Sequence, residues 1–563
     1  MRTILYMYIA LLFTCATSCS KSLSNEEVII SLPQVDSVAY YDSVQNANLT
    51  NRISGASAGY FQSAQKYNLN IVYFIPNDVQ PAANFQKRLS ELMLWTQNWY
   101  KQQMTANGYK NKTFGLFTNS AGDNVRFNII FGKKDKTQYD YDNGSSNVIA
   151  EINEFYTANP QLKTGDHNLI ILPSFYTQSN GLPGGGPIGP PFYGLEKNCF
   201  ALDYADLNIM HMGTNQTALG QAFITWFGGL VHELGHGLNL PHNRQKVSEG
   251  NDPQKGMALM WAGNSTLGLS PTFLTGADAS VLNANQVFNN DNGIYYGSVN
   301  SMLQRLNAFY DQTKAAIVLS GKYVSDKVVT NVLCFNDPNV NNEGTGVNKD
   351  YNAIAWAAKP VGVDSFYIEM PINELVEKAD GMIYEAKLKF VHANGVVKEY
   401  PYLYQFQNGI PQIDFGDKTF HDKSNWQVIG FSSQEISATY PGYAVRAIDG
   451  NIDTYWHSNW SQQPASSHPH FITVDLGITR TLNGVSMWQR QGTTDGNSKN
   501  IEIYMSIDNQ NWSLAKTTTL ASVGAQQNVG FGMTFQARYL KVVVLSSYGT
   551  NENNCSLAEI ATY

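Results

Sequence analysis

The chain has 563 residues, a net charge of −8 and a charged fraction of only 15%. A chain of this length holds about three to four domains, and its 43% apolar and 12% aromatic content can fill large cores. The acidic balance and the lack of a basic run after the first residues argue against a nucleic-acid partner. The many Tyr and Gly residues suit an extracellular, β-rich protein, which we expect to be a monomer.

Residues 1–19 have the features of a lipoprotein signal peptide. Arg2 supplies the positive region, and residues 4–13 form an apolar stretch too short to span a membrane. Cys19 ends a lipobox-like sequence and is the expected site of lipidation, with Cys15 the weaker alternative. An ordinary signal peptide is the other interpretation. We therefore expect a lipoprotein of a Gram-negative outer membrane, on the cell surface or the periplasmic face, held to the membrane by its lipid alone.

A tether at 20–55 and a catalytic domain at 56–318 are expected next. Periodicity predicts alternating strands and helices before the main motif. The expected strands are 69–75, 125–131 and 168–172, and the expected helices are 84–104, 147–156, 217–238 and a closing helix at 300–314. A Gly- and Pro-rich loop at 181–191 is either a surface excursion or a lip of the substrate cleft.

His232, His236 and His242 have the spacing of a catalytic zinc site. His232 and His236 are four residues apart, so in a helix they share one face. A continuing helix could not bring His242 back to them, so the chain must turn. Asn239 tolerates a left-handed backbone and Pro241 prevents the helix from resuming. We therefore expect the three imidazoles to converge.

Glu233 directly follows the first of these histidines and is placed to act as a general base rather than to bind the metal. Zinc accepts neutral imidazole nitrogens, and three protein ligands leave a fourth position open, as in catalytic sites. A surface helix with incidental histidines and a structural zinc site are the alternatives. The second is disfavoured because no Cys lies nearby.

The sequence HELGHGLNLPH resembles the signature HExxHxxGxxH of the metzincin zinc endopeptidases, with Asn239 in place of the usual Gly. The resemblance implies an α+β catalytic domain that hydrolyses peptide bonds. It also implies a methionine turn beneath the metal, for which Met260 is the first choice and Met257 the second. Some metzincins have a Tyr two residues after this Met, where this chain has Ala262.

Residues 319–421 are expected to form an all-β sandwich. Short alternating runs separated by turn residues predict strands at 316–319, 328–333, 365–370 and 384–390. These runs contain no cluster of catalytic side chains, so we expect a spacer.

Residues 422–563 contain Ala447-Ile-Asp-Gly-Asn-Ile-Asp-Thr-Tyr-Trp456, Phe471-Ile-Thr-Val-Asp-Leu-Gly477 and Leu557-Ala-Glu-Ile560. These segments resemble the discoidin domain, also called the coagulation factor type C domain, and related bacterial carbohydrate-binding modules. The resemblance implies a β jelly roll. Trp456 and Trp512 are expected in its core rather than at a sugar.

The same resemblance implies a structural calcium ion in this module. Its expected ligands are the side chains of Asp449, Thr454 and Glu559 and the carbonyl oxygens of Arg446, Asn451 and Ala558. The oxygen-rich turn at 449–454 is the kind of ligand set that a hard cation prefers. A plain Asx-rich turn is the alternative.

Glycan contacts in this module are expected at Tyr440, His457, Trp460 and Arg490, because sugar sites stack an aromatic ring on the sugar and bind its hydroxyls with His or Arg. Some members of the family bind lipid or protein instead. The leading hypothesis is a lipid-anchored zinc endopeptidase that acts on a protein or glycoprotein substrate and docks on glycan. The alternatives are a surface adhesin with an inactive peptidase domain and a zinc amidase.

Overall fold

The computed structural model describes residues 61–338, 350–413, 415–416, 418–462, 464, 466–549 and 553–563. The predicted lipidation site Cys19 and the tether at 20–55 lie outside these residues. Among the residues described, no helix has the length and hydropathy needed to cross a membrane. The chain divides into two compact units, the first ending at Val299 and also including Val391–Val396, the second holding the rest.

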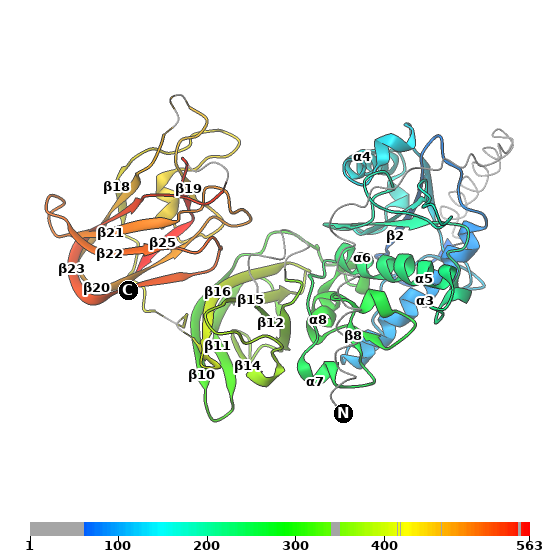
Figure 1. Cartoon of the computed structure of the whole chain (residues 1–563), viewed down its shortest axis with the longest axis horizontal. Helices are drawn as coiled ribbons and strands as arrows, with labels where there is room; N and C mark the ends of the chain where they lie inside the picture. Colours follow the sequence, from blue (N-terminus) through cyan, green and yellow to red (C-terminus); the bar gives the residue numbers. More distant parts are fainter. Residues whose placement is uncertain are drawn as a thin grey trace. The chain divides into compact units, whose positions relative to one another are not determined.

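The first unit is built on a five-stranded sheet in the order β4-β2-β5-β7-β6 (Figure 1). Neighbouring strands β4, β2, β5 and β7 are parallel, and only the edge strand β6 runs antiparallel to its neighbour. All six residues of β2 are buried, as in a parallel sheet covered on both faces. The bounds are β4 Asn128–Phe131, β2 Asn70–Ile75, β5 Asn168–Pro173, β7 Asn198–Asp203 and β6 Gly194–Leu195.

Helices cover both faces of this sheet because alternate residues of each strand point to opposite sides. Helix α4 (Gly144–Ala158) packs through Val148 and Ile152 in one core cluster with Phe200 of β7. Helix α3 (Phe85–Ala106) lies on the other face, where Phe85 stacks on Tyr73 of β2 with ring centroids 4.0 Å apart. The helix that carries the HExxH motif packs on that second face too.

This long helix begins at Ala218 and ends at Gly237, in three consecutive segments. They are α5 (Ala218–Phe223), a π-helical turn η5 (Ile224–Gly228) and α6 (Gly229–Gly237). A side chain at Gly228 would place its Cβ 2.1 Å from the carbonyl oxygen of Asn264, and one at Gly229 would meet the ring of Phe192 at 2.7 Å. The expected helix at 217–238 is confirmed, and these close approaches explain the two glycines inside it.

The remaining elements of the first unit are short. Helix α8 (Gly276–Ala284) is its last α-helix. The other bounds are β1 Phe61–Gln62, β3 Thr118–Asn119, α7 Val247–Gly250, β8 Met257–Ala258, β9 Thr272–Phe273 and the 3-10 turns η2 Lys136–Tyr139, η3 Pro160–Leu162, η4 Ile209–His211, η6 Gly263–Thr266 and η7 Gln286–Phe288.

The closing helix expected at 300–314 is wrong. Residues Ser301–Asp311 form strand β10, which pairs with β11 (Ala316–Ser325) along its whole length. Leu306 and Phe309 have a spacing that also fits a helix, but pairing with the next strand decides the conformation. The first unit therefore ends at Val299 instead of extending to the expected boundary at 318.

The part of the second unit that follows has two sheets, in the orders β10-β11-β14 and β13-β12-β15-β16-β17. Their inner faces share one apolar core that includes Leu319, Phe366 and Phe390. The further bounds are β12 Val329–Asp337, β13 Ile354–Ala358, β14 Ser365–Pro371, β15 Ile383–His392, β16 Val397–Gln407, β17 Ile410–Gln412 and the 3-10 turn η9 Ile372–Glu374.

The C-terminal part has a core of its own around the fully buried Trp456. The expectation that Trp512 also lies in this core is wrong, because Trp512 is only partly buried and packs against Lys541. Its main sheet has the order β18-β20-β23-β21-β22, with β25 also paired to β20, and β19 pairs with β24 in a second, two-stranded sheet. The bounds are β18 Gln427–Phe431, η10 Ala444–Ile448, β19 Trp456–His457, β20 His470–Trp488, β21 Asn500–Ser506, β22 Ser513–Thr519, β23 Gln527–Val544, β24 Ser556–Leu557 and β25 Glu559–Thr562.

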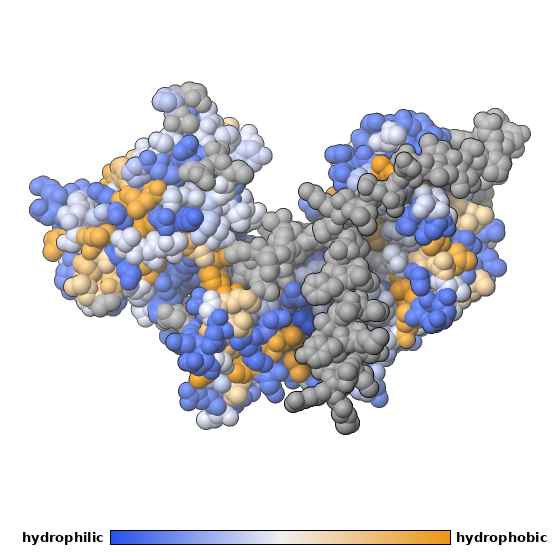
Figure 2. Space-filling view, viewed as in Figure 1, coloured by the Kyte–Doolittle hydropathy of each residue, from blue (hydrophilic) through white to orange (hydrophobic). Residues whose placement is uncertain are grey.

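The face drawn in Figure 2 carries hydrophilic side chains over much of its described surface, with hydrophobic ones scattered among them. Single exposed apolar residues of this kind are normal on proteins and need no partner. Exposed aromatic side chains of the C-terminal part include Tyr440 and Trp460, which are 57% and 42% exposed.

Candidate active site

His232, His236 and His242 meet at one point beside α6. The Nε2 atom of His242 lies 3.2 Å from Nε2 of His232 and 3.1 Å from Nε2 of His236. All three side chains are buried, and their ligand atoms lie within 4.8 Å of one another. The structure thus brings the three histidines together.

Backbone carbonyls orient two of these rings. Nδ1 of His232 lies 2.8 Å from the carbonyl oxygen of Leu259, and Nδ1 of His236 lies 2.8 Å from that of Leu240. A carbonyl only accepts hydrogen bonds, so each Nδ1 carries the proton and each Nε2 presents a lone pair. Burial lowers the pKa of His232 to about 4 and that of His236 to about 3, which keeps both rings neutral at pH 7. Converging imidazole lone pairs are the donor set that zinc prefers, so these residues fit a zinc ion.

Glu233 lies between the helix and the edge strand of the sheet. The N–H of Gly194 in β6 donates a hydrogen bond to its carboxylate, and burial raises its pKa to about 8 against the opposing effect of this bond. A Cβ at Gly194 would lie 2.2 Å from the Cβ of His236, so only glycine allows the edge strand to come this close. The edge strand, the carboxylate and the histidines therefore form one compact site.

The turn that returns His242 to the helix is the one expected. Asn239 has φ 69°, in the left-handed region, directly after the helix ends. Its N–H donates to the carbonyl of His236, and the N–H of Leu240 donates to that of Gly235. These bonds close the turn, so Asn239 adopts the left-handed conformation that glycine commonly supplies after a helix.

Met260 lies beneath the histidines. It is fully buried, and a Cβ at Gly235 would sit 2.4 Å from its Sδ atom. The preceding residue, Leu259, holds His232 through its carbonyl. Met257 is only partly buried and lies in the short strand β8, so Met260 occupies the position expected of the methionine turn.

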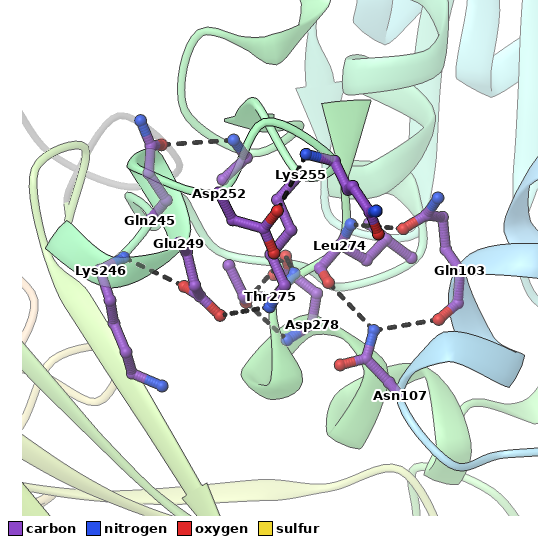
Figure 3. A network of polar contacts seen from close by, with 12 residues as sticks. Gln103, Asn107, Gln245, Lys246, Glu249, Asp252, Lys255, Leu274, Thr275 and Asp278 are labelled. Atoms are coloured by element: carbon purple, nitrogen blue, oxygen red, sulfur yellow. Dashed lines mark hydrogen bonds and ion pairs between the residues drawn. The ribbon is translucent and has the colours of Figure 1, made fainter. Parts of the chain in front are cut away.

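A polar network fixes the chain that follows His242 (Figure 3). Asn243 donates to the buried carboxylate of Asp278 at 2.6 Å and accepts from the hydroxyl of Thr275 at 2.8 Å. Burial raises the pKa of Asp278 to about 7. In the same network, Asn107, directly after α3, donates to the carbonyl of Leu274 at 3.0 Å. The segment after His242 is thus tied to both α8 and α3.

The Gly- and Pro-rich loop at 181–191 packs against the same long helix. A Cβ at Gly185 would lie 2.9 Å from the ring of Trp226, in the π-helical turn, and Phe192 packs edge-to-face on this Trp with centroids 5.1 Å apart. This loop leads into the edge strand β6, whose Gly194 contacts Glu233 of α6. Part of this loop therefore lies against the helix that carries the motif.

The residues expected to hold calcium lie close together in the C-terminal part. The carboxylate of Glu559 accepts from the N–H of Gly450 at 2.7 Å and also from the Lys423 ammonium. Thr454 donates to Asp449 at 2.6 Å and contacts the carbonyl oxygen of Asn451 at 2.9 Å. The oxygen donors therefore fit a calcium ion, but the Lys423 ammonium would compete with it for Glu559.

The two expected carbonyl ligands of that ion are neighbours of these side chains in the chain. Arg446 lies in η10, just ahead of Asp449, and Ala558 directly precedes Glu559. The ion would thus join the oxygen-rich turn to the C-terminal strand.

Two of the expected glycan contacts, His457 and Trp460, lie beside Glu435, whose side chain is buried. Its carboxylate accepts hydrogen bonds from the N–H groups of Trp460 and Ser461. The backbone N–H of Glu435 donates to the carbonyl of His457. Burial raises the pKa of Glu435, but hydrogen bonds from the Ser461 hydroxyl and from backbone N–H groups outweigh it and lower the pKa to about 2. Glu435 therefore holds the segment that carries the exposed Trp460.

Arg490 and Tyr440 complete this region. The Arg490 guanidinium lies 4.2 Å from the ring centroid of Tyr455. The pKa of His457 is lowered mainly by burial, and the nearby Arg490 charge lowers it further. Tyr440 belongs to the loop between Glu435 and Gly442, which are paired by a bridge. The structure brings all four expected residues into one neighbourhood, with His457 buried and the other three side chains more exposed.

Three functional contributors were missed in the sequence: Gly194, Asn243 and Glu435. Gly194 acts through its small size at a two-residue strand, a length that leaves no periodic pattern. Asn243 directly follows the third His of the motif, which could have marked it as a supporting residue. Glu435 is one of many acidic residues, and only its fold neighbours distinguish it.

Comparison with protein families identifies an F5/8 type C domain at residues 428–560. The predicted discoidin-type module is therefore confirmed. Curated relatives match this same part: a sialidase of Micromonospora viridifaciens is 32% identical over 141 residues, and a galactose oxidase of Gibberella zeae is 30% identical over 142 residues. The match covers 25% of this chain in each case, but only 21% and 20% of those two proteins.

Another relative matches a larger part of the chain. The crystal structure of OgpA from Akkermansia muciniphila is 34% identical, covers 61% of this chain and 94% of its own, and superposes with a TM-score of 0.56. A catalytically inactive form of OgpA was crystallised with an O-glycopeptide, glycodrosocin, as its substrate.

Proposed function

Because the chain belongs to the same family as OgpA, we propose that it is a zinc endopeptidase of the metzincin type that cleaves O-glycosylated peptides. The observation that carries this proposal is the convergence of His232, His236 and His242 beside Glu233. OgpA, which shares 34% identity with this chain, binds an O-glycopeptide substrate. The site and the relative thus support the same reaction class.

The chemistry divides between the metal and the protein. Zinc, when bound by the three histidines, polarises the scissile carbonyl and acidifies water. A bound zinc ion would favour the ionised carboxylate of Glu233 against the effect of burial. In that form, Glu233 takes the proton of the attacking water and passes it to the leaving amine. The carbonyls of Leu259 and Leu240 keep His232 and His236 oriented, as supporting hydrogen bonds do for metal-binding imidazoles.

The edge strand β6 supplies a way to align the substrate. It ends the sheet on the side of α6, and its Gly194 bonds to Glu233. An extended peptide that adds to an open sheet edge gains main-chain hydrogen bonds without regard to its side chains. A substrate aligned along β6 would therefore pass Glu233 and the three histidines.

The C-terminal F5/8 type C domain is proposed to bind glycan through Tyr440, His457, Trp460 and Arg490. A tethered binding module raises the effective concentration of substrate near the active site without any new contact there. Glycan binding would therefore help most on dilute or surface-bound glycoproteins.

Matched peptides test the proposal. Zinc-loaded protein is incubated with a Ser- or Thr-containing peptide that carries an O-linked sugar and with the same peptide without it, and the cuts are mapped by mass spectrometry. We expect cleavage of the glycosylated peptide alone, and none by Glu233→Gln. Equal cleavage of both would leave a general peptidase, and cleavage of neither would overturn the proposal.

The alternatives give other outcomes in the same experiment. A surface adhesin with an inactive peptidase domain would bind the glycopeptide without cutting it. A zinc amidase would release product from sugar or cell-wall amides and leave the peptides intact. The joint presence of Glu233 and all three histidines argues against an inactive domain, and the spacing of His242 from His236 favours a peptidase over an amidase.

Attachment to an outer membrane through lipid on Cys19 remains part of the proposal. Its support is the signal-like sequence of residues 1–19. Cys19→Ala should leave the protein in the soluble fraction or block its processing, and unchanged partitioning into detergent would contradict this anchor.

A further inference from the structure

Residues far from the motif hold the C-terminal end of the helix that carries His236. The last carbonyls of a helix have no partner within it. Here the carbonyl of Gly237 lies 2.6 Å from Nδ1 of His167, and that of Leu238 accepts from Asn285 at 2.9 Å. Both donors come from outside the helix and satisfy carbonyls within two residues of His236.

His167 is itself held by Tyr296. The ring is fully buried, and its Nε2 lies 2.5 Å from the hydroxyl of Tyr296, which also accepts from the N–H of Gln286 at 3.1 Å. Because the carbonyl of Gly237 only accepts, Nδ1 donates and Nε2 must accept from the Tyr296 hydroxyl. With a neutral imidazole, both ring nitrogens of His167 and the hydroxyl of Tyr296 therefore have hydrogen-bond partners.

Tyr296 is fixed in turn by the segment Val391–Val396. Tyr296 has φ 57°, and its N–H donates to the carbonyl of Asn394 at 2.8 Å. A Cβ at Gly395 would lie 2.5 Å from the Tyr296 ring and 3.1 Å from the carbonyl of Ala284. The same segment therefore contacts Tyr296 and the end of α8, directly before Asn285.

The segment Val391–Val396 contains the last two residues of β15 and the turn that connects β15 to β16. The N–H of Gly395 donates to the carbonyl of His392, and the N–H of His392 donates to that of Val396, which makes the turn tight. Gly395 has φ +82°, a conformation suited to glycine. Although its strands belong to the second unit, this turn groups with the first.

We propose that Tyr296 and His167 are positioning residues for the zinc site, and that the Val391–Val396 turn is a structural part of the peptidase unit. Together they fix where the helix ends, so that the chain turns at Asn239 and returns with His242. The proposal rests on the proposed zinc site for its functional meaning. It assigns to the middle domain a role beyond that of a spacer.

Tyr296→Phe tests the hydroxyl in the full-length protein, with Tyr295→Phe as the matched control. The Tyr295 hydroxyl bonds only to Asp291, at 3.0 Å, among the contacts described here. For Tyr296→Phe we expect hydrogen exchange at residues 237–243 to rise about tenfold, zinc affinity measured against a chelator to fall about tenfold, and kcat to fall with KM nearly unchanged. Tyr295→Phe should leave all three near wild type. Equal effects of both variants would overturn the proposal.

Gly395→Ala tests the turn, with Gly409→Ala as its control. Both glycines have positive φ, so both variants carry the same backbone strain, but a Cβ at Gly409 meets nothing within 4 Å. Only Gly395→Ala should accelerate exchange at 237–243. Identical exchange in the two variants would show that the turn does not act on the helix.

These readouts separate the two proposals. If the wild-type protein neither binds zinc nor cuts glycopeptides, the proposed function falls, while the contrast in exchange still decides whether Tyr296 and the turn hold the helix. If zinc binds and peptides are cut but exchange is unchanged in Tyr296→Phe and Gly395→Ala, only the positioning role falls.

Discussion

Gly194 of the edge strand and His236 of the helix lie so close that a Cβ on Gly194 would be 2.2 Å from the Cβ of His236. The same Gly194 bonds through its N–H to Glu233. One residue of the sheet thus contacts both Glu233, the proposed general base, and His236, one of the proposed zinc ligands. The spacing between sheet and helix is therefore part of the site, and any side chain at 194 would separate them.

His236→Ala should remove the metal. The variant leaves only His232 and His242 to bind zinc, and two imidazoles do not complete the three-ligand set of a catalytic site. Elemental analysis should find about one zinc per wild-type chain and almost none in the variant. His211→Ala is the control, since His211 lies in η4, outside the cluster. Full zinc content in His236→Ala would refute the assignment.

Glu233→Gln should keep zinc and fold but lose hydrolysis. General acid–base catalysis contributes about 10²–10⁴-fold, and an amide cannot take up the proton. The measurement is kcat on a glycopeptide, together with zinc content and melting temperature to show that the site is intact. Activity within a few-fold of wild type would mean that another group acts as the base.

The motif, its turn and its methionine could be predicted because their residue types and spacing act locally. His232 and His236 share a helical face by periodicity alone, and Asn239 marks the turn by its backbone preference. Strands β6 and β7 could not be foreseen in the same way. A two-residue edge strand shows no periodic pattern. The residues from Cys199 to Asp203 form a run that is too short, and too varied in polarity, to be recognised as a strand.

Contacts between distant residues were also beyond the sequence. The helix expected at 300–314 became strand β10 because pairing with β11 overrides the spacing of Leu306 and Phe309. The hydrogen bond between His167 and Tyr296 joins residues 129 positions apart. Nothing in the local pattern around either residue indicates that bond.

Trp460→Ala should weaken glycan binding without unfolding the module. The side chain is 42% exposed, so little core is lost, and stability should change by about 0.5 kcal/mol or less. We expect a wild-type Kd on the order of 0.1–1 mM and at least a tenfold increase in the variant. Trp512→Ala is the control and should bind glycan as wild type does. Trp512 is not among the four proposed glycan contacts, and its ring packs on the Lys541 ammonium at 4.2 Å instead. If an array of glycans shows no binding by wild type, the glycan role is wrong.

Removal of calcium should lower the melting temperature of the C-terminal module in the full chain. A ligand at a hundred times its Kd stabilises the folded state by about 2.7 kcal/mol. Lys423→Met should bind calcium more tightly, because the competing ammonium at Glu559 is gone. Calorimetry with and without a chelator measures both effects. A melting temperature indifferent to calcium in both proteins would leave the turn at 449–454 as a plain Asx-rich turn.

Glu435 should make the module sensitive to acid. Its folded pKa of about 2 lies below its ordinary value of 4.5, so its stabilisation is complete above pH 4.5 and is lost as the pH falls toward 2. The shift corresponds to about 3 kcal/mol. Glu435→Gln should flatten this part of the stability curve, measured by denaturant unfolding between pH 2 and 7. Glu502→Gln, on the partly exposed face of β21, should not change it.

The π-helical turn η5 has a consequence for sequence length. A π turn holds one residue more than an α turn, so deleting one residue between Ile224 and Gly228 would make the helix uniform. The segment before the deletion would then rotate by about 100° relative to the segment after it. Phe223, now buried, would turn away from the core, while His232 and His236 would keep their register. The extra residue therefore lets one helix direct Phe223 into the core and His232 and His236 toward His242.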